Sequence, residues 1–275
     1  MRRAFDLSLA VAGALALTFL LLPLLALFLQ VSPETLVHEL GSKVAGDALL
    51  VSLETSAIAN ALILAVGTPA AYLLATRRFR ARELVLTAID LPLVLPPAVA
   101  GIALLAAFGQ RNGLLGGTLS AFGVSVAFTQ AAVVLAVIFV ASPFYLRQAI
   151  AAFASVDPDL LAASRTLGAG SFRTFRRVAL PLAAPGLGVG SSLAFARGLG
   201  EFGATIMFAG SVQGQTQTLP LAIYAELDQD FDAAIAIGAL LVLVSAAVLL
   251  AVKLLPSWTR SGSISPVPFA PSRSS

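Results

Sequence analysis

The sequence predicts an all-α polytopic membrane protein, with six transmembrane helices and a cytoplasmic loop between the fourth and the fifth. Of its 275 residues, 58% are hydrophobic and only 11% are charged, and the mean hydropathy is +0.94. A soluble domain of this size could not expose so much apolar surface. Six stretches are apolar over the roughly 20 residues that a spanning helix needs. They lie at about Leu7–Leu29, Leu53–Thr76, Ala88–Phe108, Phe128–Leu146, Leu182–Phe208 and Ala233–Leu255.

The first stretch has a second interpretation, because Arg2 and Arg3 precede it as they would precede the core of a secretory signal peptide. The apolar run is longer than that of a signal peptide, and no small-residue cleavage site follows Pro23 cleanly. We therefore expect the first helix to be retained.

The placement of lysine and arginine predicts the orientation, because these residues collect in cytoplasmic loops. With the first terminus inside, only Lys43 and Arg111 fall outside, and Arg197 lies within the fifth stretch. The other fourteen cations are inner: Arg2, Arg3, Arg77, Arg78, Arg80, Arg82, Arg147, Arg165, Arg173, Arg176, Arg177, Lys253, Arg260 and Arg273. Both termini are therefore expected in the cytoplasm. Acidic residues gather instead in the two longer outer connections, at Glu34, Glu39, Asp47, Glu226, Asp228, Asp230 and Asp232.

The third stretch contains Pro92, Pro96 and Pro97, which we expect to kink or interrupt the helix near its inner end. Such a break is either structural or part of a gate. Asp90 precedes the prolines and is expected at the cytoplasmic edge.

The inner loop Asp157–Pro181 has clear helix signals. Asp157 is a good N-cap and Pro158 suits the first helical position, while Gly168 or Gly170 provides the positive φ that ends a helix. We expect one short helix from Pro158 to Leu167 and a second one capped by Ser171.

The second loop helix is expected to be amphipathic. Its apolar face would carry Phe172, Phe175 and Val178 or Ala179, and another face would carry three arginines. A helix of this kind either docks a cytoplasmic partner or lies on the membrane surface.

The spacing of this loop resembles the signature of the permease subunits of ATP-binding-cassette importers of the type I architecture. That signature reads Glu-Ala-Ala, three residues, Gly, nine residues, a β-branched apolar residue, one residue and Leu-Pro. Here it appears as Ala162-Ala163-Ser164, Gly168, Val178 and Leu180-Pro181, with Ala162 in place of the usual Glu and Ser164 in place of the second Ala. The resemblance implies a coupling helix that fits a groove of the ATPase subunit. The residues expected in this contact are Ala162, Ala163, Ser164, Arg165, Leu167, Gly168, Phe172, Phe175, Val178, Leu180 and Pro181.

The fifth stretch contains two charges, Arg197 and Glu201, at a spacing that puts them on one helix face. An unpaired charge in lipid costs several kcal/mol. The two residues therefore form a structural ion pair, or Arg197 faces the path of an anion. The candidates for the path or its gate are Arg197, Glu201, Pro96 and Pro97.

The run from Gly200 to Ala204 resembles a motif of the permeases for the oxyanions molybdate, tungstate and sulfate. The runs 216–224 and 91–102 look most like molybdate permeases. This resemblance implies an ATP-driven importer of a tetrahedral oxyanion, molybdate before tungstate or sulfate. The alternative from another class is an ion-coupled carrier, which would need several carboxylates within the membrane, where only Glu201 qualifies.

The chain is not expected to be an enzyme. It has no cysteine, one histidine and no phosphate-binding loop, so we expect no catalytic residue, no metal and no cofactor of its own. The resemblance implies ATP and magnesium in a cytoplasmic ATPase partner, a second copy of this chain, and an external solute-binding protein. The acidic outer segments either dock that protein or are ordinary solvated loops. Membrane lipid is expected around the chain and nucleic acid is not, and the location is the inner membrane of a bacterium or archaeon. Residues 1–256 would form the permease domain and 257–275, rich in Ser and Pro, a disordered tail.

Overall fold

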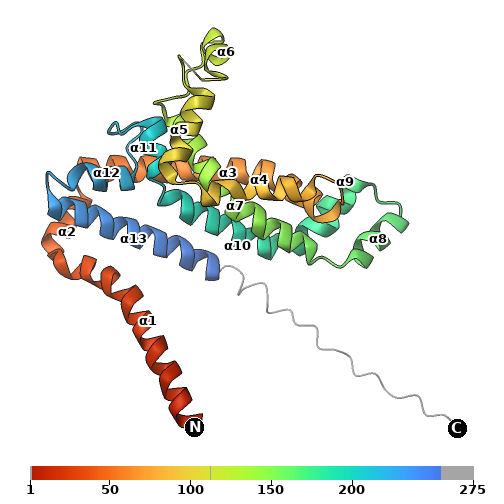
Figure 1. Cartoon of the computed structure of the whole chain (residues 1–275), viewed down its shortest axis with the longest axis horizontal. Helices are drawn as coiled ribbons and strands as arrows, with labels where there is room; N and C mark the ends of the chain where they lie inside the picture. The colour runs from red at the N-terminus through yellow and green to blue at the C-terminus, as the bar shows by residue number, and fades with distance from the viewer. Residues whose placement is uncertain (1, 112, 255–275) are drawn as a thin grey trace.

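The computed structural model describes residues 2–111 and 113–254, and Figure 1 shows a bundle of helices in which α1 runs away from the rest. No strand occurs in the described residues. The predicted tail 257–275 lies outside them. The helices are α1 (Arg2–Gln30), α2 (Pro33–Leu40), α3 (Lys43–Thr76), α4 (Arg82–Val94), α5 (Pro97–Phe108), α6 (Gly116–Ala121), α7 (Gln130–Ala154), α8 (Pro158–Thr166), α9 (Ser171–Thr174), the π-helical turn η1 (Phe175–Ala179), α10 (Leu180–Leu199), α11 (Gly203–Ala209), α12 (Leu219–Glu226) and α13 (Phe231–Leu254).

Five of the described helical segments are long and apolar enough to span a membrane, and a bent pair makes a sixth. The five are Phe5–Gln30, Lys43–Thr76, Gln130–Ala154, Ser171–Leu199 and Phe231–Ala251. The prediction of an all-helical membrane protein is confirmed, and the number of spans agrees with six when the bent pair is taken as one.

The third expected span is not one helix, because α4 and α5 are bent by 116°. Leu95 and Pro96, both extended, separate the two helices, and Pro97 opens α5. A residue before proline is pushed out of the helical region, and proline has no N–H to continue the ladder, so a break is present. It lies midway, between helices of 13 and 12 residues, and not near the inner end as expected. In Figure 1, α5 leaves the bundle and carries α6 away from it.

Other expected bounds are wrong as well. The second span begins at Lys43 and not at Leu53, and the third begins at Arg82 and not at Ala88. The fifth span ends at Leu199, and its expected last residues form the separate helix α11. The fourth was expected to end at Leu146 but continues to Ala154, so Arg147 lies inside a helix. The expected bound was placed at Leu146 because Arg147 interrupts the apolar run. An arginine that has an acidic partner can nevertheless lie within a spanning helix.

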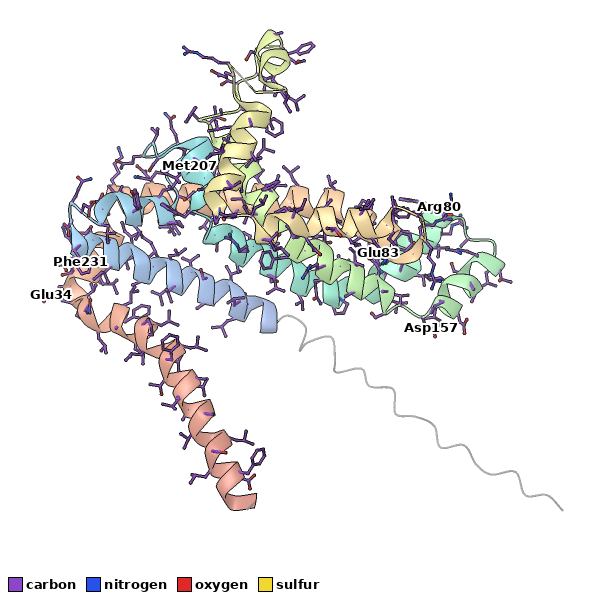
Figure 2. The ribbon with its side chains drawn as sticks, viewed as in Figure 1. Glu34, Arg80, Glu83, Asp157, Met207 and Phe231 are labelled. Atoms are coloured by element: carbon purple, nitrogen blue, oxygen red, sulfur yellow. The ribbon has the colours of Figure 1, made fainter. Side chains whose placement is uncertain are left out.

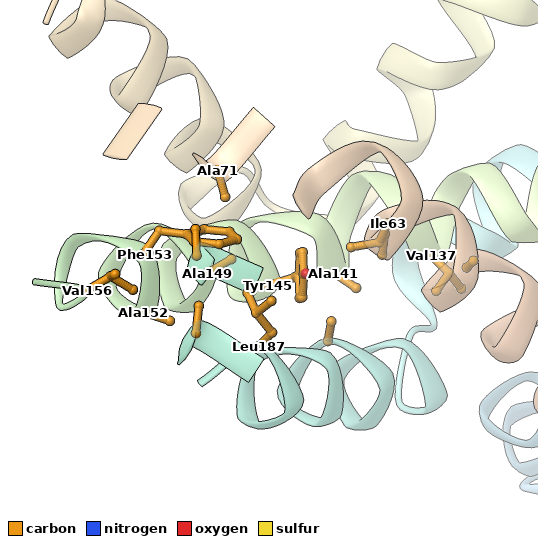
Figure 3. Packing of buried hydrophobic residues seen from close by; sticks show 14 of the residues in the cluster. Ile63, Ala71, Val137, Ala141, Tyr145, Ala149, Ala152, Phe153, Val156 and Leu187 are labelled. Atoms are coloured by element: carbon orange, nitrogen blue, oxygen red, sulfur yellow. The ribbon is translucent and has the colours of Figure 1, made fainter. Parts of the chain in front are cut away.

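The centre of the bundle is the contact among α3, α7 and α10 (Figure 3). Tyr145 of α7 is fully buried there, and its hydroxyl shares a hydrogen bond of 2.5 Å with Thr68 of α3. Gly67 makes this packing possible, because a Cβ at that position would lie 2.9 Å from the Tyr145 ring. Small residues at such contacts let membrane helices approach closely.

Different charged residues lie at the two ends of the bundle. Figure 2 shows Arg80, Glu83 and Asp157 at one end, and Glu34 and Phe231 at the other. The first end is the one that the arginines place in the cytoplasm, and it carries α8 and α9 (Figure 1).

Candidate functional site

The first candidate site is the loop that joins α7 to α10. In α8, Asp157 accepts a hydrogen bond from the Asp159 N–H at 2.9 Å, as expected of an N-cap. Gly168 has φ +82 and ends the helix. The Gly168 N–H donates to the Arg165 carbonyl and the Ala169 N–H to the Ser164 carbonyl, which is the pattern of a Schellman cap. The predicted first loop helix is therefore present, one residue shorter than expected.

The second loop helix is linked to the first through Ser164. Its hydroxyl lies 3.1 Å from the hydroxyl of Thr174, which is fully buried. Alanine at position 164 could not make this bond. Ser164, one of the two departures from the resembled signature, therefore links α8 to α9.

Between α9 and α10 the chain forms the π-helical turn η1, in which the Leu180 N–H donates to the Phe175 carbonyl five residues earlier. Pro181 explains the wider turn. In an α-helix its ring would press on the Arg177 carbonyl, and it has no N–H for that carbonyl. The Leu180-Pro181 pair thus shapes the junction between the loop and the membrane helix.

The aromatic residues of the loop do not share one face, contrary to expectation. Phe175 packs on the rings of Tyr72 and Phe153, with centroid distances of 4.9 and 6.1 Å. Phe172 is 73% exposed and Leu167 is 87% exposed. Phe175 therefore anchors the loop to the bundle, whereas Leu167 and Phe172 face outward.

All predicted coupling residues lie at the end of the bundle that the arginines predict to be cytoplasmic, in α8, its cap, α9, η1 or the first turn of α10. Ala162, Ala163, Ser164 and Arg165 are in α8, Leu167 and Gly168 follow it, Phe172 is in α9, Phe175 and Val178 are in η1, and Leu180 and Pro181 begin α10. The exposed members beside Leu167 and Phe172 are Ala162, Ala163, Arg165, Gly168 and Pro181.

The second candidate site is the ion pair of Arg197 and Glu201, with 2.7 Å between Nη2 and Oε2. Glu201 lies in the break between α10 and α11, and its other oxygen accepts the Ala204 N–H at 2.9 Å. The Glu201 side chain is 1% exposed and that of Arg197 is 30% exposed. The carboxylate is thus fully engaged, while Arg197 keeps one side open.

The open side of Arg197 faces a cavity of about 150 Å³ at the break between α4 and α5. The cavity is lined by Pro92, Leu93, Leu95, Pro97, Ala100, Val140, Phe144 and Arg197. Two of the four predicted path residues, Arg197 and Pro97, therefore meet at one cavity. Glu201 does not line the cavity but forms the ion pair with Arg197. Pro96 is exposed in the break between α4 and α5.

The packing around this cavity depends on Gly203. A Cβ there would lie 2.4 Å from the Cβ of Pro97, so α11 and α5 touch through glycine. Gly198 plays the same part against α7, because a Cβ at that position would lie 2.7 Å from Val137 Cγ1. Gly200 differs from both, because a Cβ at that position would meet nothing within 4 Å.

An ion pair that the sequence did not reveal joins α4 to α7. Arg147 Nε lies 2.6 Å from Asp90 Oδ1. The two residues are 57 positions apart, so no spacing rule brings them together. Asp90 was expected at the cytoplasmic edge, but α4 begins eight residues before it.

The opposite end of the bundle carries the acidic residues. Glu34 is in α2, Asp47 in α3 and Asp232 in α13, and these helices contact one another through α2. No described residue of the outer acidic set is buried. Within the described residues, no group of three or more His, Asp or Glu could hold a metal ion.

Comparison with known proteins gives a family match over residues 67–261, to the binding-protein-dependent transport system inner membrane component. The molybdenum transport system permease protein ModB of Mycobacterium tuberculosis (strain ATCC 25618 / H37Rv) is 46% identical over 88% of this chain and 90% of its own length. ModB of Escherichia coli (strain K12) is 44% identical over 65% of this chain and 78% of its own.

The solved structures show the same fold at low identity. A bacterial alginate ABC transporter, in complex with an alginate pentasaccharide-bound periplasmic protein, has a chain with a TM-score of 0.74 and 17% identity, covering 97% of this chain and 98% of that one. The MetNI methionine ABC transporter in an inward-facing conformation has a chain with a TM-score of 0.62 and 19% identity, covering 78% of this chain and 95% of that one.

Proposed function

This chain belongs to the family of binding-protein-dependent transport system inner membrane components, and we infer from this that it is the membrane-spanning permease of an ATP-driven molybdate importer. The substrate assignment is supported most directly by the identity of 46% with a molybdenum permease over most of both chains. Arg197, open to the cavity at the helix break, supports an anionic substrate.

ATP hydrolysis belongs to a cytoplasmic ATPase partner that binds ATP and magnesium. The surface offered to it consists of the exposed apolar side chains Leu167 and Phe172, with Arg165 and Arg173 beside them. Aromatic and arginine side chains of this kind are enriched in protein interfaces. The permease itself holds no cofactor and catalyses no reaction.

The acidic outer end fits a docking protein better than it fits free substrate. A negative rim repels molybdate, so direct capture of the dianion there is unfavourable. A solute-binding protein with basic residues around its site would be attracted to the rim and would deliver the anion.

Two copies of the chain enclose one path, in the inner membrane of a bacterium or archaeon with both termini cytoplasmic. ATP binding draws the ATPase subunits together and moves α8 with them, which opens the path outward. Hydrolysis reverses the movement. Residues 1–256 act as one permease domain in this cycle.

Substrate competition in vesicles tests the assignment. Proteoliposomes holding the chain with its ATPase and binding protein should take up radiolabelled molybdate, and unlabelled molybdate should compete far better than sulfate. Tungstate has the same charge and shape and is expected to compete as well. Uptake of sulfate in place of molybdate would overturn the substrate assignment and leave the family unchanged.

A further inference from the structure

The pair of Asp90 and Arg147 lies where a membrane protein rarely exposes charge. Their side chains are 36% and 61% exposed. Asp90 follows the start of α4 by eight residues, and Arg147 precedes the end of α7 by seven. At 1.5 Å per residue, the pair lies roughly 10–12 Å inside the cytoplasmic ends of both helices. Figure 2 marks that end with Arg80, Glu83 and Asp157.

Charged side chains inside membrane spans face a protein interior or a water-filled cavity and do not face lipid. Arg147 and Asp90 are too exposed to belong to the interior of this chain. The seam between α4 and α7 therefore faces water or a partner at this depth.

The same seam contains the cavity of Arg197. Phe144 lines that cavity and lies three residues before Arg147, on one face of α7. On α4, Leu93 lines the cavity and lies three residues after Asp90. The ion pair is thus placed between the cavity and the cytoplasm, across the exit from it.

We propose that the Asp90–Arg147 bridge is the inner gate of the anion path, and that Arg147 receives the oxyanion when the bridge opens. This proposal rests on the function proposed above. A guanidinium offers several N–H donors to a tetrahedral oxyanion. While the bridge is closed, the Arg147 Nε–H donates to Asp90 Oδ1, and the carboxylate neutralises the charge.

The elements around the gate allow it to move. α4 contacts α7 but buries no residue of its own, so no fully buried side chain holds it in place. α7 continues through Ser155 to Asp157, the cap of α8. A displacement of α8 by the ATPase therefore reaches Arg147 across this three-residue joint and along the last two turns of α7.

Cysteine labelling tests the gate directly, because the chain has no cysteine of its own. In inside-out vesicles holding the chain and its ATPase, Phe144→Cys should react slowly with a charged, membrane-impermeant methanethiosulfonate. Adding Asp90→Asn should raise that rate about fivefold, by loss of one ion pair. Asp90→Arg with Arg147→Asp restores a bridge and should return the rate to the slow value.

The matched control is Leu146→Cys, at the same depth of α7 but in the apolar groove against α3. Its rate should not change with Asp90→Asn. An unchanged Phe144→Cys rate, or an equal increase at both cysteines, would overturn the gate, because the second result reports general loosening.

A comparison of molybdate uptake among variants tests whether Arg147 binds the anion. Arg147→Gln opens the gate and removes the charge, so molybdate uptake should fall about tenfold further than with Asp90→Asn. Arg147→Lys should recover part of the uptake. Equal losses in Asp90→Asn and Arg147→Gln, with no recovery in Arg147→Lys, would refute this role.

The two proposals fail separately. If unmodified vesicles do not import molybdate, the proposed function fails, whatever the labelling shows. If they import molybdate and the labelling rate of Phe144→Cys does not change with Asp90→Asn, the inner gate alone fails.

Discussion

Glu201 has a buried carboxylate whose two oxygens have different partners, the Arg197 guanidinium and the N-terminal Ala204 N–H of α11. This one side chain therefore neutralises an arginine inside the membrane and begins a new helix. The spacing of four residues predicted the ion pair. It did not predict the break of α10, because nothing local shows that Glu201 lies beyond the last helical residue.

Removal of the carboxylate should be costly. Glu201→Gln leaves Arg197 without its counter-charge, and breaking a buried pair in this way costs about 3–5 kcal/mol. We expect a large drop in the Tm of the purified chain. The double variant Arg197→Gln with Glu201→Gln should cost less than the sum of the two single variants. Additive losses would show that the two residues do not interact.

Gly203 gives a second prediction at this scale, with Gly200 as its control. Gly203→Ala puts a methyl group 2.4 Å from the Cβ of Pro97, and overpacking of this kind costs roughly 1–3 kcal/mol. Gly200→Ala meets nothing within 4 Å. Only Gly203→Ala should lower Tm and uptake. Equal effects would contradict the close contact of α5 with α11.

At the scale of elements, the inner loop was predictable because its signals are local. Asp157, Pro158 and Gly168 mark the first loop helix, and all three act as expected. The π-helical turn was not predicted, although Pro181 provides the reason for it. Phe172 is exposed whereas Phe175 packs against the bundle, so the single apolar face assigned from helical spacing was wrong.

Gly168 provides the test of this element. Any other residue at φ +82 is strained by roughly 1–2 kcal/mol, without a clash. Gly168→Val should displace α8 and strongly reduce ATP hydrolysis that depends on transport, while membrane insertion stays normal. Gly170→Ala is the matched control, since φ there is −66 and nothing lies within 4 Å. Unchanged hydrolysis in Gly168→Val would contradict the coupling role of the loop.

At the scale of the whole molecule, composition and charge distribution predicted the membrane, the helical class and the number of spans. They could not predict the 116° bend of α4 against α5 or the Asp90–Arg147 contact. The local prolines predicted that the helix breaks but not the size of the bend, and the contact joins residues 57 positions apart. The contacts with a second copy and with protein partners cannot be derived from the packing of one chain.

The orientation can be tested with single cysteines in this cysteine-free chain. Gln229 and Arg80 are exposed at opposite ends of the bundle. In right-side-out vesicles, Gln229→Cys should react with an impermeant thiol reagent, and Arg80→Cys should react only after permeabilisation. The reverse pattern would contradict cytoplasmic termini.

The ATP dependence of uptake tests the central claim most directly. Proteoliposomes with the permease, its ATPase and its binding protein should accumulate molybdate only when ATP and magnesium reach the ATPase side. Accumulation without ATP, or by the permease alone, would contradict the conclusion that this chain is the membrane half of an ATP-driven importer.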